Sequence, residues 1–359
     1  MPKYEIHPEI ELAETMPSSF YRSAEVFESL SEKVFAKSWQ FVGAKELVAE
    51  EGMVHPFTLE GTGEPMLLSN SGGEVKCLSN VCTHRGDILC DQPAKARNIT
   101  CAYHGRRFNL DGKFQHMPQF KAAKGFPRPE DNLHEFPLQQ WGPWLFASLG
   151  NAYYFSDVLE AMQSKVGFMP LEEFKLFADR GKDYHINAHW ALYCDNYLEG
   201  FHIPFVHAGL NEALDYGNYE TVLFKHANLQ IGYAEGEENT FDFPEGHEDF
   251  GKSIAAYYFW VFPNMMFNFY PWGLSVNVVK PISKDETKVS FISYVYDESK
   301  LDLGAGAWLD KVEQEDEEVV EGVHRGMKSR VYNTGRYSPE MEKGVHHFHR
   351  LLVEFLNAE

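Results

Sequence analysis

Two short segments of this 359-residue chain each place a histidine close behind a cysteine, and this pattern limits the fold more than any other feature. The first is Cys82-Thr-His84 and the second, after sixteen intervening residues, is Cys101-Ala-Tyr-His104. With five cysteines and 16 histidines in the chain, this arrangement arises by chance in roughly one sequence in ten thousand. Structural cysteines beside surface histidines therefore explain it poorly, and it indicates a metal centre held by two short loops.

Two kinds of metal centre suit these four side chains. Zinc binds two sulfur and two nitrogen ligands tetrahedrally, although its sites more often pair ligands as C-x2-C or H-x3-5-H. In a Rieske [2Fe–2S] centre, one iron binds two thiolates and the other binds two imidazoles, which raises the reduction potential. Here each loop supplies one thiolate and one imidazole, which favours the Rieske centre and leaves zinc as the alternative.

A second candidate site lies in the segment CDNYLEGFHIPFVH, where Glu199, His202 and His207 fall close together. We expect a helix over 189–203, in which Glu199 and His202 share a face because they are three positions apart. Pro204 disfavours helical backbone at Ile203, so the chain should bend before it reaches His207. Buried structural histidines would explain the same residues without a metal.

A third ligand is predicted from the periodicity of a long helix expected over 305–329. Asp316 falls in the middle of its apolar stripe, whereas Glu315, Glu317 and Glu318 are expected to point to water. The stripe consists of Leu309, Val312, Val319, Val320 and Val323. A carboxylate on an apolar face needs a partner, which is a metal or a buried arginine. Two histidines and one carboxylate are the ligands of non-haem Fe(II) oxygenases.

The order of expected helices and strands along the chain predicts an α+β protein. Residues 24–39 have helical spacing, and 40–150 consist of short β-rich runs between turn residues, typical of a small all-β unit. The second half mixes strands with helices, the last of them over 339–357 with Ser338-Pro339 at its start. The expected strands of this half cover 221–232, 255–270, 274–282 and 287–297.

Composition excludes several classes of protein. The net charge of −21 argues against nucleic acid or an anionic membrane as the partner. Five cysteines are too few for a disulfide scaffold. The N-terminus has no apolar signal segment, and the most apolar stretch, 254–274, contains two prolines, so a membrane span is not expected. We therefore expect a cytoplasmic protein.

CTHRGDIL and CAYHGRRFNLDGKF closely resemble the two halves of the Rieske motif in Rieske-type non-haem iron oxygenases. Arg106 departs from this motif, because an aromatic residue usually follows its His-Gly pair. The resemblance implies an N-terminal helical segment (1–39), an all-β Rieske domain (40–150) and a helix-grip catalytic domain (151–359) on which the first segment packs. It assigns the [2Fe–2S] cluster to Cys82, His84, Cys101 and His104, and the mononuclear iron to His202, His207 and Asp316.

The resemblance also implies how the two centres cooperate. Subunits of this family form rings, commonly homotrimers, and a carboxylate three residues before the first iron-binding histidine bridges the cluster of one subunit to the iron of its neighbour. That position is Glu199 here, with Asp195 as a nearby alternative. Because the chain has no nucleotide-binding glycine motif, a separate reductase using flavin and NAD(P)H is implied.

Glu199 and its context resemble the subgroup that acts on choline, carnitine and betaine. Its members hydroxylate a C–H bond next to nitrogen with dioxygen, and an N-methyl product then releases formaldehyde. The aromatic segment 257–272 could form a cage for a cation, although a hydrophobic sheet packed against the long helices explains the same residues about twice as often or more. The alternatives are an oxygenase acting on aromatic or alicyclic rings, a Rieske electron carrier, and a protein that binds hydrophobic ligands.

Overall fold

The computed structural model describes residues 3–150, 153–207, 218–234, 239–301, 303–306 and 309–358. The chain divides into two compact units, one formed by Phe35–Tyr153 and the other by Met1–Val34 together with Tyr154–Glu359. The two ends of the chain therefore belong to the same unit. Among the described residues, no helix is both long and apolar enough to cross a membrane.

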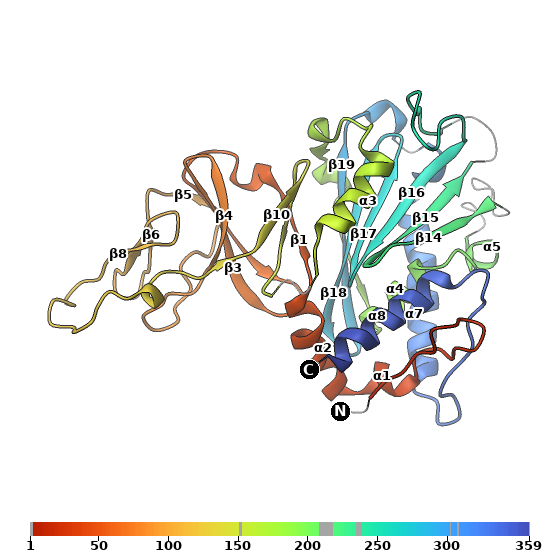
Figure 1. Cartoon of the computed structure of the whole chain (residues 1–359), viewed down its shortest axis with the longest axis horizontal. Helices are drawn as coiled ribbons and strands as arrows, with labels where there is room; N and C mark the ends of the chain where they lie inside the picture. The colour runs from red at the N-terminus through yellow and green to blue at the C-terminus, as the bar shows by residue number, and fades with distance from the viewer. Residues whose placement is uncertain are drawn as a thin grey trace. The chain divides into compact units, whose positions relative to one another are not determined.

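The unit Phe35–Tyr153 is built from short antiparallel strands, which confirms the all-β prediction (Figure 1). The strands form three sheets, ordered β5-β2-β3-β4-β9, β1-β11-β10 and β6-β7-β8. Residues paired across neighbouring strands share the core of this unit. For example, Leu67 of β3 is paired with Leu78 of β4, and both side chains are fully buried. The strands are β1 (Gln40–Ala44), β2 (Met53–Leu59), β3 (Glu64–Ser71), β4 (Glu74–Ser79), β5 (Ala94–Lys95), β6 (Ile99–Thr100), β7 (Arg107–Phe108), β8 (Phe114–His116), β9 (Glu135–Phe136), β10 (Leu138–Trp141) and β11 (Trp144–Ala147), with single 3-10 turns η1 (Phe35–Lys37), η2 (Lys45–Val48) and η3 (Pro129–Asp131).

The other unit is built on one antiparallel sheet, ordered β12-β19-β18-β17-β16-β15-β14, with β13 also paired to β19 (Figure 1). Two runs predicted as single strands are each two strands. The run 255–270 turns at Pro263, which has no N–H to continue a ladder, and 221–232 turns between Leu223 and Ala227. The strands are β12 (Lys175–Leu176), β13 (Lys182–Ile186), β14 (Glu220–Leu223), β15 (Ala227–Tyr233), β16 (Ile254–Val261), β17 (Met265–Tyr270), β18 (Gly273–Ser283) and β19 (Glu286–Val295).

Long helices pack beside this sheet, as expected for a helix-grip arrangement. Helix α4 contacts β18, α7 and α8, and the N-terminal helices α1 and α2 contact α7 and α8. The Lys33 ammonium ties the N-terminal segment to the C-terminal helix by donating to the carbonyls of Leu356 and Ala358, both at 2.8 Å. The helices are α1 (Ser18–Arg22), α2 (Ala24–Lys33), α3 (Ser156–Val166), α4 (Trp190–Tyr197), α5 (Ile203–Val206), α7 (Leu309–Met327) and α8 (Lys343–Asn357), with 3-10 turns η4 (Leu171–Glu173), η5 (Ala178–Arg180), η7 (Glu298–Lys300) and η8 (Gly304–Gly306).

The last helix and the first long helix have boundaries that differ from the prediction. The last helix begins at Lys343 with Glu342 as its N-cap, not at Pro339. Ser338 instead starts a preceding turn, in which its hydroxyl accepts from the N–H of Met341 at 3.3 Å. Ser-Pro pairs favour turns as well as helix starts, and the sequence does not distinguish the two. The first long helix ends at Lys33, whereas its apolar spacing extends to residue 39.

Candidate metal centres

The two Cys-His loops have the same backbone design. In the first, the N–H of Gly86 donates to the carbonyl of Cys82 at 3.0 Å, and in the second Gly105 donates to Cys101 at 3.0 Å. Both glycines have positive φ, +74° and +72°, a conformation that L side chains rarely adopt. The N–H groups of Cys82 and Cys101 in turn donate to the backbone carbonyls of the residues after these glycines, Asp87 and Arg106, both at 2.8 Å. Each loop therefore presents its cysteine and histidine on one tight turn.

The structure brings the four predicted cluster residues together as two pairs. Cys82 and Cys101 are 3% and 2% exposed, and both are free thiols. Burial raises the pKa of Cys101, which also has a side-chain hydrogen bond with Cys82, so a thiolate here requires a positively charged partner. The rings of His84 and His104 lie 4.8 Å apart, centroid to centroid. Sulfur and nitrogen donors are thus grouped separately, as a two-iron cluster requires.

One orphaned atom supports a ligand at this place. Nδ1 of His104 is buried and has no hydrogen-bond partner among the described residues. A single tetrahedral zinc ion would bring all four donor atoms to one point. Among the described residues, however, the donor atoms that lie within 4.8 Å of one another are those of a different group, His202, His207 and Asp316. The arrangement therefore fits a [2Fe–2S] cluster and disfavours the zinc alternative.

Arg106, the departure from the usual motif, is a buried structural cation. It is 2% exposed and donates to Oδ1 of Asp131 at 2.6 Å and to the Asp131 carbonyl at 3.1 Å. Its guanidinium lies 5.0 to 5.7 Å from the ring centroids of Phe108, Phe114 and Phe126. Arginine stacks on such faces and keeps its charge when buried. Arg106 thus stands at the motif position usually held by an aromatic residue and packs against aromatic rings itself.

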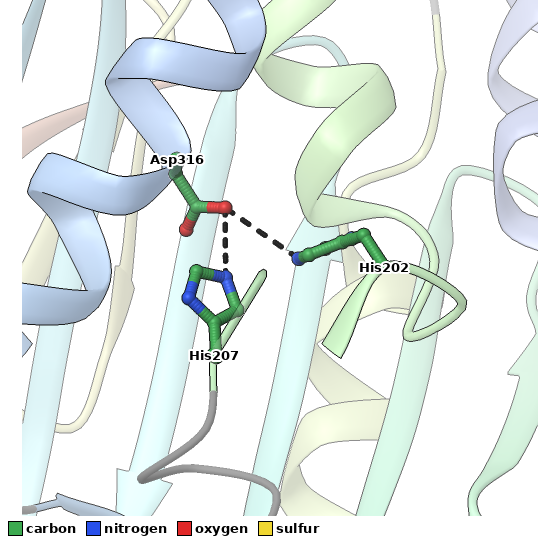
Figure 2. A group of neighbouring side chains, drawn as sticks. All are labelled: His202, His207 and Asp316. Atoms are coloured by element: carbon green, nitrogen blue, oxygen red, sulfur yellow. Dashed lines mark hydrogen bonds and ion pairs between the residues drawn. The ribbon is translucent and has the colours of Figure 1, made fainter. Parts of the chain in front are cut away.

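The second group of predicted residues also converges, although it comes from distant parts of the chain. Oδ1 of Asp316, on α7, lies 3.0 Å from Nε2 of His207 and 3.5 Å from Nε2 of His202 (Figure 2). Two atoms bound at right angles to one ion, each about 2.1 Å from it, lie about 3.0 Å apart. The three donor atoms are therefore spaced as ligands of a single ion would be. Within the described part of the chain, no buried arginine pairs with Asp316.

Carboxylates on the far side of each imidazole hold the rings in place. Oε1 of Glu199 lies 2.6 Å from Nδ1 of His202, and Oε2 of Glu315 lies 2.8 Å from Nδ1 of His207. A metal-binding histidine commonly donates its other N–H to a carboxylate in this way. The prediction that Glu315 points only to water is wrong: its side chain is 28% exposed and turns back to His207.

Electrostatics also favour a cation at this place. Burial lowers the pKa of His207, but hydrogen bonds and charge from Asp316 and Glu315 outweigh it and raise that pKa. Such an acidic environment around two imidazoles needs a positive charge, which a divalent metal ion supplies.

Glu199 and His202 meet through a turn and not along a helix face as predicted. Helix α4 ends at Tyr197, and Oε2 of Glu199 accepts the N–H groups of Phe201 and of His202, the latter at 3.1 Å. Glu199 thus closes the turn that leads into the short helix α5, which begins at Ile203 after its N-cap His202. The prediction of non-helical backbone at Ile203 is also wrong, because Pro204 sits in the first turn of α5, where proline is tolerated.

Asp195 is engaged elsewhere. Its Oδ2 accepts from the Tyr21 hydroxyl at 2.9 Å, and its Oδ1 lies 2.8 Å from Nε2 of His349. Asp195 therefore joins α4 to the N-terminal segment and to α8, and Glu199, not Asp195, is the carboxylate that contacts His202.

A cavity of about 110 Å³ lies beside the three donor atoms, between the sheet and helices α4 and α7. Tyr258 and Tyr270, from the predicted aromatic segment, line it, with their rings edge to face at 6.0 Å. Burial raises the pKa of each tyrosine of this lining, so all remain neutral in solution near pH 7. The lining comprises Tyr193, Asn196, Tyr197, Glu199, His202, Ile203, His207, Tyr219, Gln230, Tyr258, Asn268, Tyr270, Asn277, Phe291, Ala305, Val312, Glu313 and Asp316.

Several residues of this site were not predicted. Asn196 donates to Oδ1 of Asp316 at 2.6 Å, and Tyr193 donates to Oε2 of Glu313 at 2.6 Å. Glu313 could have been found by the same periodicity as Asp316, since it lies only about 60° from it around the helix. Tyr197 and Tyr219 carry no comparable signal, because tyrosines are common in buried strands and helices.

Known proteins resemble the chain along its whole length. The family model described as Rieske [2Fe-2S] domain matches residues 38–130, and the model described as ring hydroxylating alpha subunit (catalytic domain) matches 175–358. The carnitine monooxygenase oxygenase subunit of Escherichia coli (strain K12) is 31% identical, over 95% of this chain and 93% of the relative. The chloroplastic choline monooxygenase of Arabidopsis thaliana is 30% identical, over 96% and 83%.

A solved structure adds a match in three dimensions. A quaternary ammonium Rieske monooxygenase in complex with an inhibitor superimposes with a TM-score of 0.80 at 25% identity, over 98% of this chain and 99% of that one. The electron-carrier and ligand-binding alternatives are excluded by the match to the catalytic domain. The chain belongs to the family of ring-hydroxylating alpha subunits, oxidoreductases with a Rieske [2Fe–2S] cluster and a mononuclear iron.

Proposed function

We propose that this oxygenase hydroxylates a C–H bond next to the nitrogen of a small quaternary ammonium compound. The observation that carries the proposal is the cavity, which places four neutral tyrosines, Tyr197, Tyr219, Tyr258 and Tyr270, in the same lining as the three donor atoms. Tyrosine faces attract a desolvated cation. The relatives named choline and carnitine monooxygenase act on compounds of this class.

In this proposal, Cys82, His84, Cys101 and His104 hold the cluster, and His202, His207 and Asp316 hold the ferrous ion. When bound, these centres supply electrons and activate dioxygen. The overall reaction takes one C–H bond, O2, two electrons and two protons, and gives C–OH and water. If the carbon belongs to an N-methyl group, the hemiaminal releases formaldehyde and the demethylated amine.

The chain's own residues position the reaction. Glu199 and Glu315 fix the two imidazoles, and Asn196 fixes the orientation of the Asp316 carboxylate. The tyrosine faces can hold the ammonium group of the substrate.

We further propose the assembly that the family resemblance implies. Subunits form a homotrimer in which Glu199 links the iron of one subunit to the cluster of its neighbour, and a separate flavin- and NAD(P)H-dependent reductase supplies electrons. A cytoplasmic location stays a prediction. Measurement of the molar mass in solution by light scattering tests the trimer, and a monomeric active enzyme contradicts it.

A substrate screen tests the proposed reaction. The oxygenase is mixed with a surrogate reductase, and O2 uptake and formaldehyde are recorded with choline, L-carnitine, glycine betaine, toluene and naphthalene. We expect uptake that depends on a quaternary ammonium compound and produces its oxidised product in equal amount. Product formed only from the aromatic hydrocarbons would overturn the proposal and favour ring hydroxylation.

A further inference from the structure

One ionisable group in the cavity has no part in the chemistry described above. Glu313 of α7 is 3% exposed, although a carboxylate is seldom fully buried without a charged partner. Its Oε2 accepts from the Tyr193 hydroxyl at 2.6 Å, whereas its Oε1 is buried with no hydrogen-bond partner among the described residues. It lies in the cavity lining, one helical turn before Asp316.

The surroundings of Glu313 do not supply the missing partner. Burial raises its pKa well above the usual range, and the Tyr193 hydrogen bond opposes this only in part. In the described residues, the cavity lining contains no lysine or arginine. The charge of Lys182, which is not in this lining, lowers that pKa but does not offset the effect of burial. Apart from the proposed iron, which Asp316 already faces, the ionised form therefore gains a counter-ion inside the cavity only when a cation enters it.

We infer that Glu313, supported by Tyr193, is the counter-charge that binds the ammonium group of the substrate, and that the enzyme prefers quaternary ammonium compounds without a carboxylate. This inference rests on the proposed function. A carboxylate bound near Glu313 would be repelled, and no lysine or arginine of the described lining would neutralise it. The segments 208–217 and 235–238, outside the described residues, contain no lysine or arginine in their sequences.

The test measures binding without turnover. Anaerobic calorimetry gives Kd for choline, for its uncharged isostere 3,3-dimethylbutan-1-ol and for the carboxylated γ-butyrobetaine. In Glu313→Gln, the amide oxygen can still accept from Tyr193, so shape and packing are kept. We expect the variant to bind choline about 10- to 100-fold more weakly while its Kd for the isostere changes less than about 2-fold.

Matched controls separate charge from structure. Glu318→Gln removes an exposed charge from the same helix and is expected to leave all three values unchanged. Bound iron and the visible spectrum of the cluster show that Glu313→Gln is folded and loaded. Wild type is expected to bind choline more tightly than γ-butyrobetaine. In Glu313→Gln the ratio of these two Kd values should be smaller, because the charge that attracts the ammonium group and repels the carboxylate is gone.

The outcomes distinguish this inference from the proposed function. If wild type binds none of the quaternary ammonium compounds, the proposed function fails together with the inference. If wild type binds choline and Glu313→Gln binds it equally well, or loses choline and the isostere to the same extent, Glu313 is structural and only the inference fails. A wild-type preference for γ-butyrobetaine also overturns it.

Discussion

Oδ1 of Asp316 lies 3.0 Å from Nε2 of His207, although the two residues are 109 positions apart in the sequence. Their proximity joins α7 to the turn that follows α5 at one point, beside the cavity. His202, at the start of α5, approaches the same oxygen. The site therefore depends on α7 and both ends of α5 being folded together. The predictions below test what each part of this arrangement does.

Asp316→Ala removes one proposed iron ligand. We expect turnover to fall by at least about 100-fold, since even groups outside the ligand set are worth about 10- to 100-fold. Bound iron should drop from about three to about two per chain, while the visible spectrum of the cluster stays unchanged. Iron analysis and oxygen-uptake assays measure both, with the exposed Glu318→Ala as the control. Retained turnover would remove Asp316 from the ligand set.

Glu199→Gln weakens the proposed link between the centres, because an amide cannot accept a proton as a carboxylate does. We expect both metals to remain and the single-turnover oxidation of the cluster to slow by about 10- to 100-fold. Stopped-flow absorbance after mixing the reduced enzyme with substrate and O2 measures the rate. Asp195→Asn, at a residue held by Tyr21 and His349, serves as the comparison and should oxidise its cluster normally. A normal rate in Glu199→Gln argues against the bridge.

Glu315→Gln tests the second orienting carboxylate, which lies on the far side of His207. The amide is a weaker acceptor for Nδ1–H, so the imidazole becomes less basic and less firmly placed. We expect the affinity for ferrous iron to fall by about 10- to 100-fold. Titration of the apoprotein with Fe(II) gives this value directly. An affinity equal to that of Glu318→Gln would mean that Glu315 does not support the site.

Arg106→Met tests the buried cation of the iron–sulfur unit. The variant fills similar space but leaves the Asp131 carboxylate without its charge partner. Breaking one side of a buried pair costs about 3–5 kcal/mol, so this unit should unfold, and its cluster bleach, at lower denaturant concentration. Guanidinium titration followed by visible absorbance measures the change. Arg107→Met, at an exposed neighbour, should behave as wild type.

His189 gives the stability a pH dependence. Burial, followed by the neighbouring His324, lowers the pKa of His189 to about 3, whereas an unfolded histidine titrates near 6.5. Below about pH 6.5 only the unfolded chain takes up this proton, so the contribution is complete above that pH and is lost as the pH falls toward 3. At pH 5 the loss is about 2 kcal/mol.

The variant His189→Asn isolates this contribution. Asparagine is a good N-cap and can keep the acceptor that His189 offers to the N–H of Ala191 at 3.2 Å. Urea unfolding at pH 7 and pH 5 should show a drop in stability that is smaller by about 2 kcal/mol in the variant. The exposed His185→Asn should keep the wild-type drop. An unchanged drop in His189→Asn would mean that another group carries it.

The sequence predicted the architecture and the grouping of the proposed donor residues because both have strong local signals. The Cys-His spacing requires two tight loops, and the position of Asp316 in an apolar stripe requires a partner for its charge. The segment after Tyr197 was less predictable. Whether Glu199 continues the helix or closes a turn before the next one depends on which backbone N–H groups its carboxylate reaches, and periodicity carries no information on this.

Glu315 and Glu313 show the second limit of sequence reasoning. Both lie within about 100° of Asp316 around the helix, at the edges of the stripe where a side chain can face either solvent or protein. Which of these it does is decided by the neighbouring elements: His207 attracts Glu315, and Tyr193 on α4 holds Glu313. Such partners become known only when the tertiary structure is known.

Both oxygens of Glu199 are already engaged inside its own subunit, one by His202 and the other by two backbone N–H groups. The rotational freedom of this side chain is therefore lost when the monomer folds. In the proposed trimer, a neighbouring subunit that docks against Glu199 would meet a carboxylate of fixed direction, so the encounter would carry almost no further ordering entropy at this contact. Assembly should then be limited by the fit of the larger surfaces and not by the search of this one side chain.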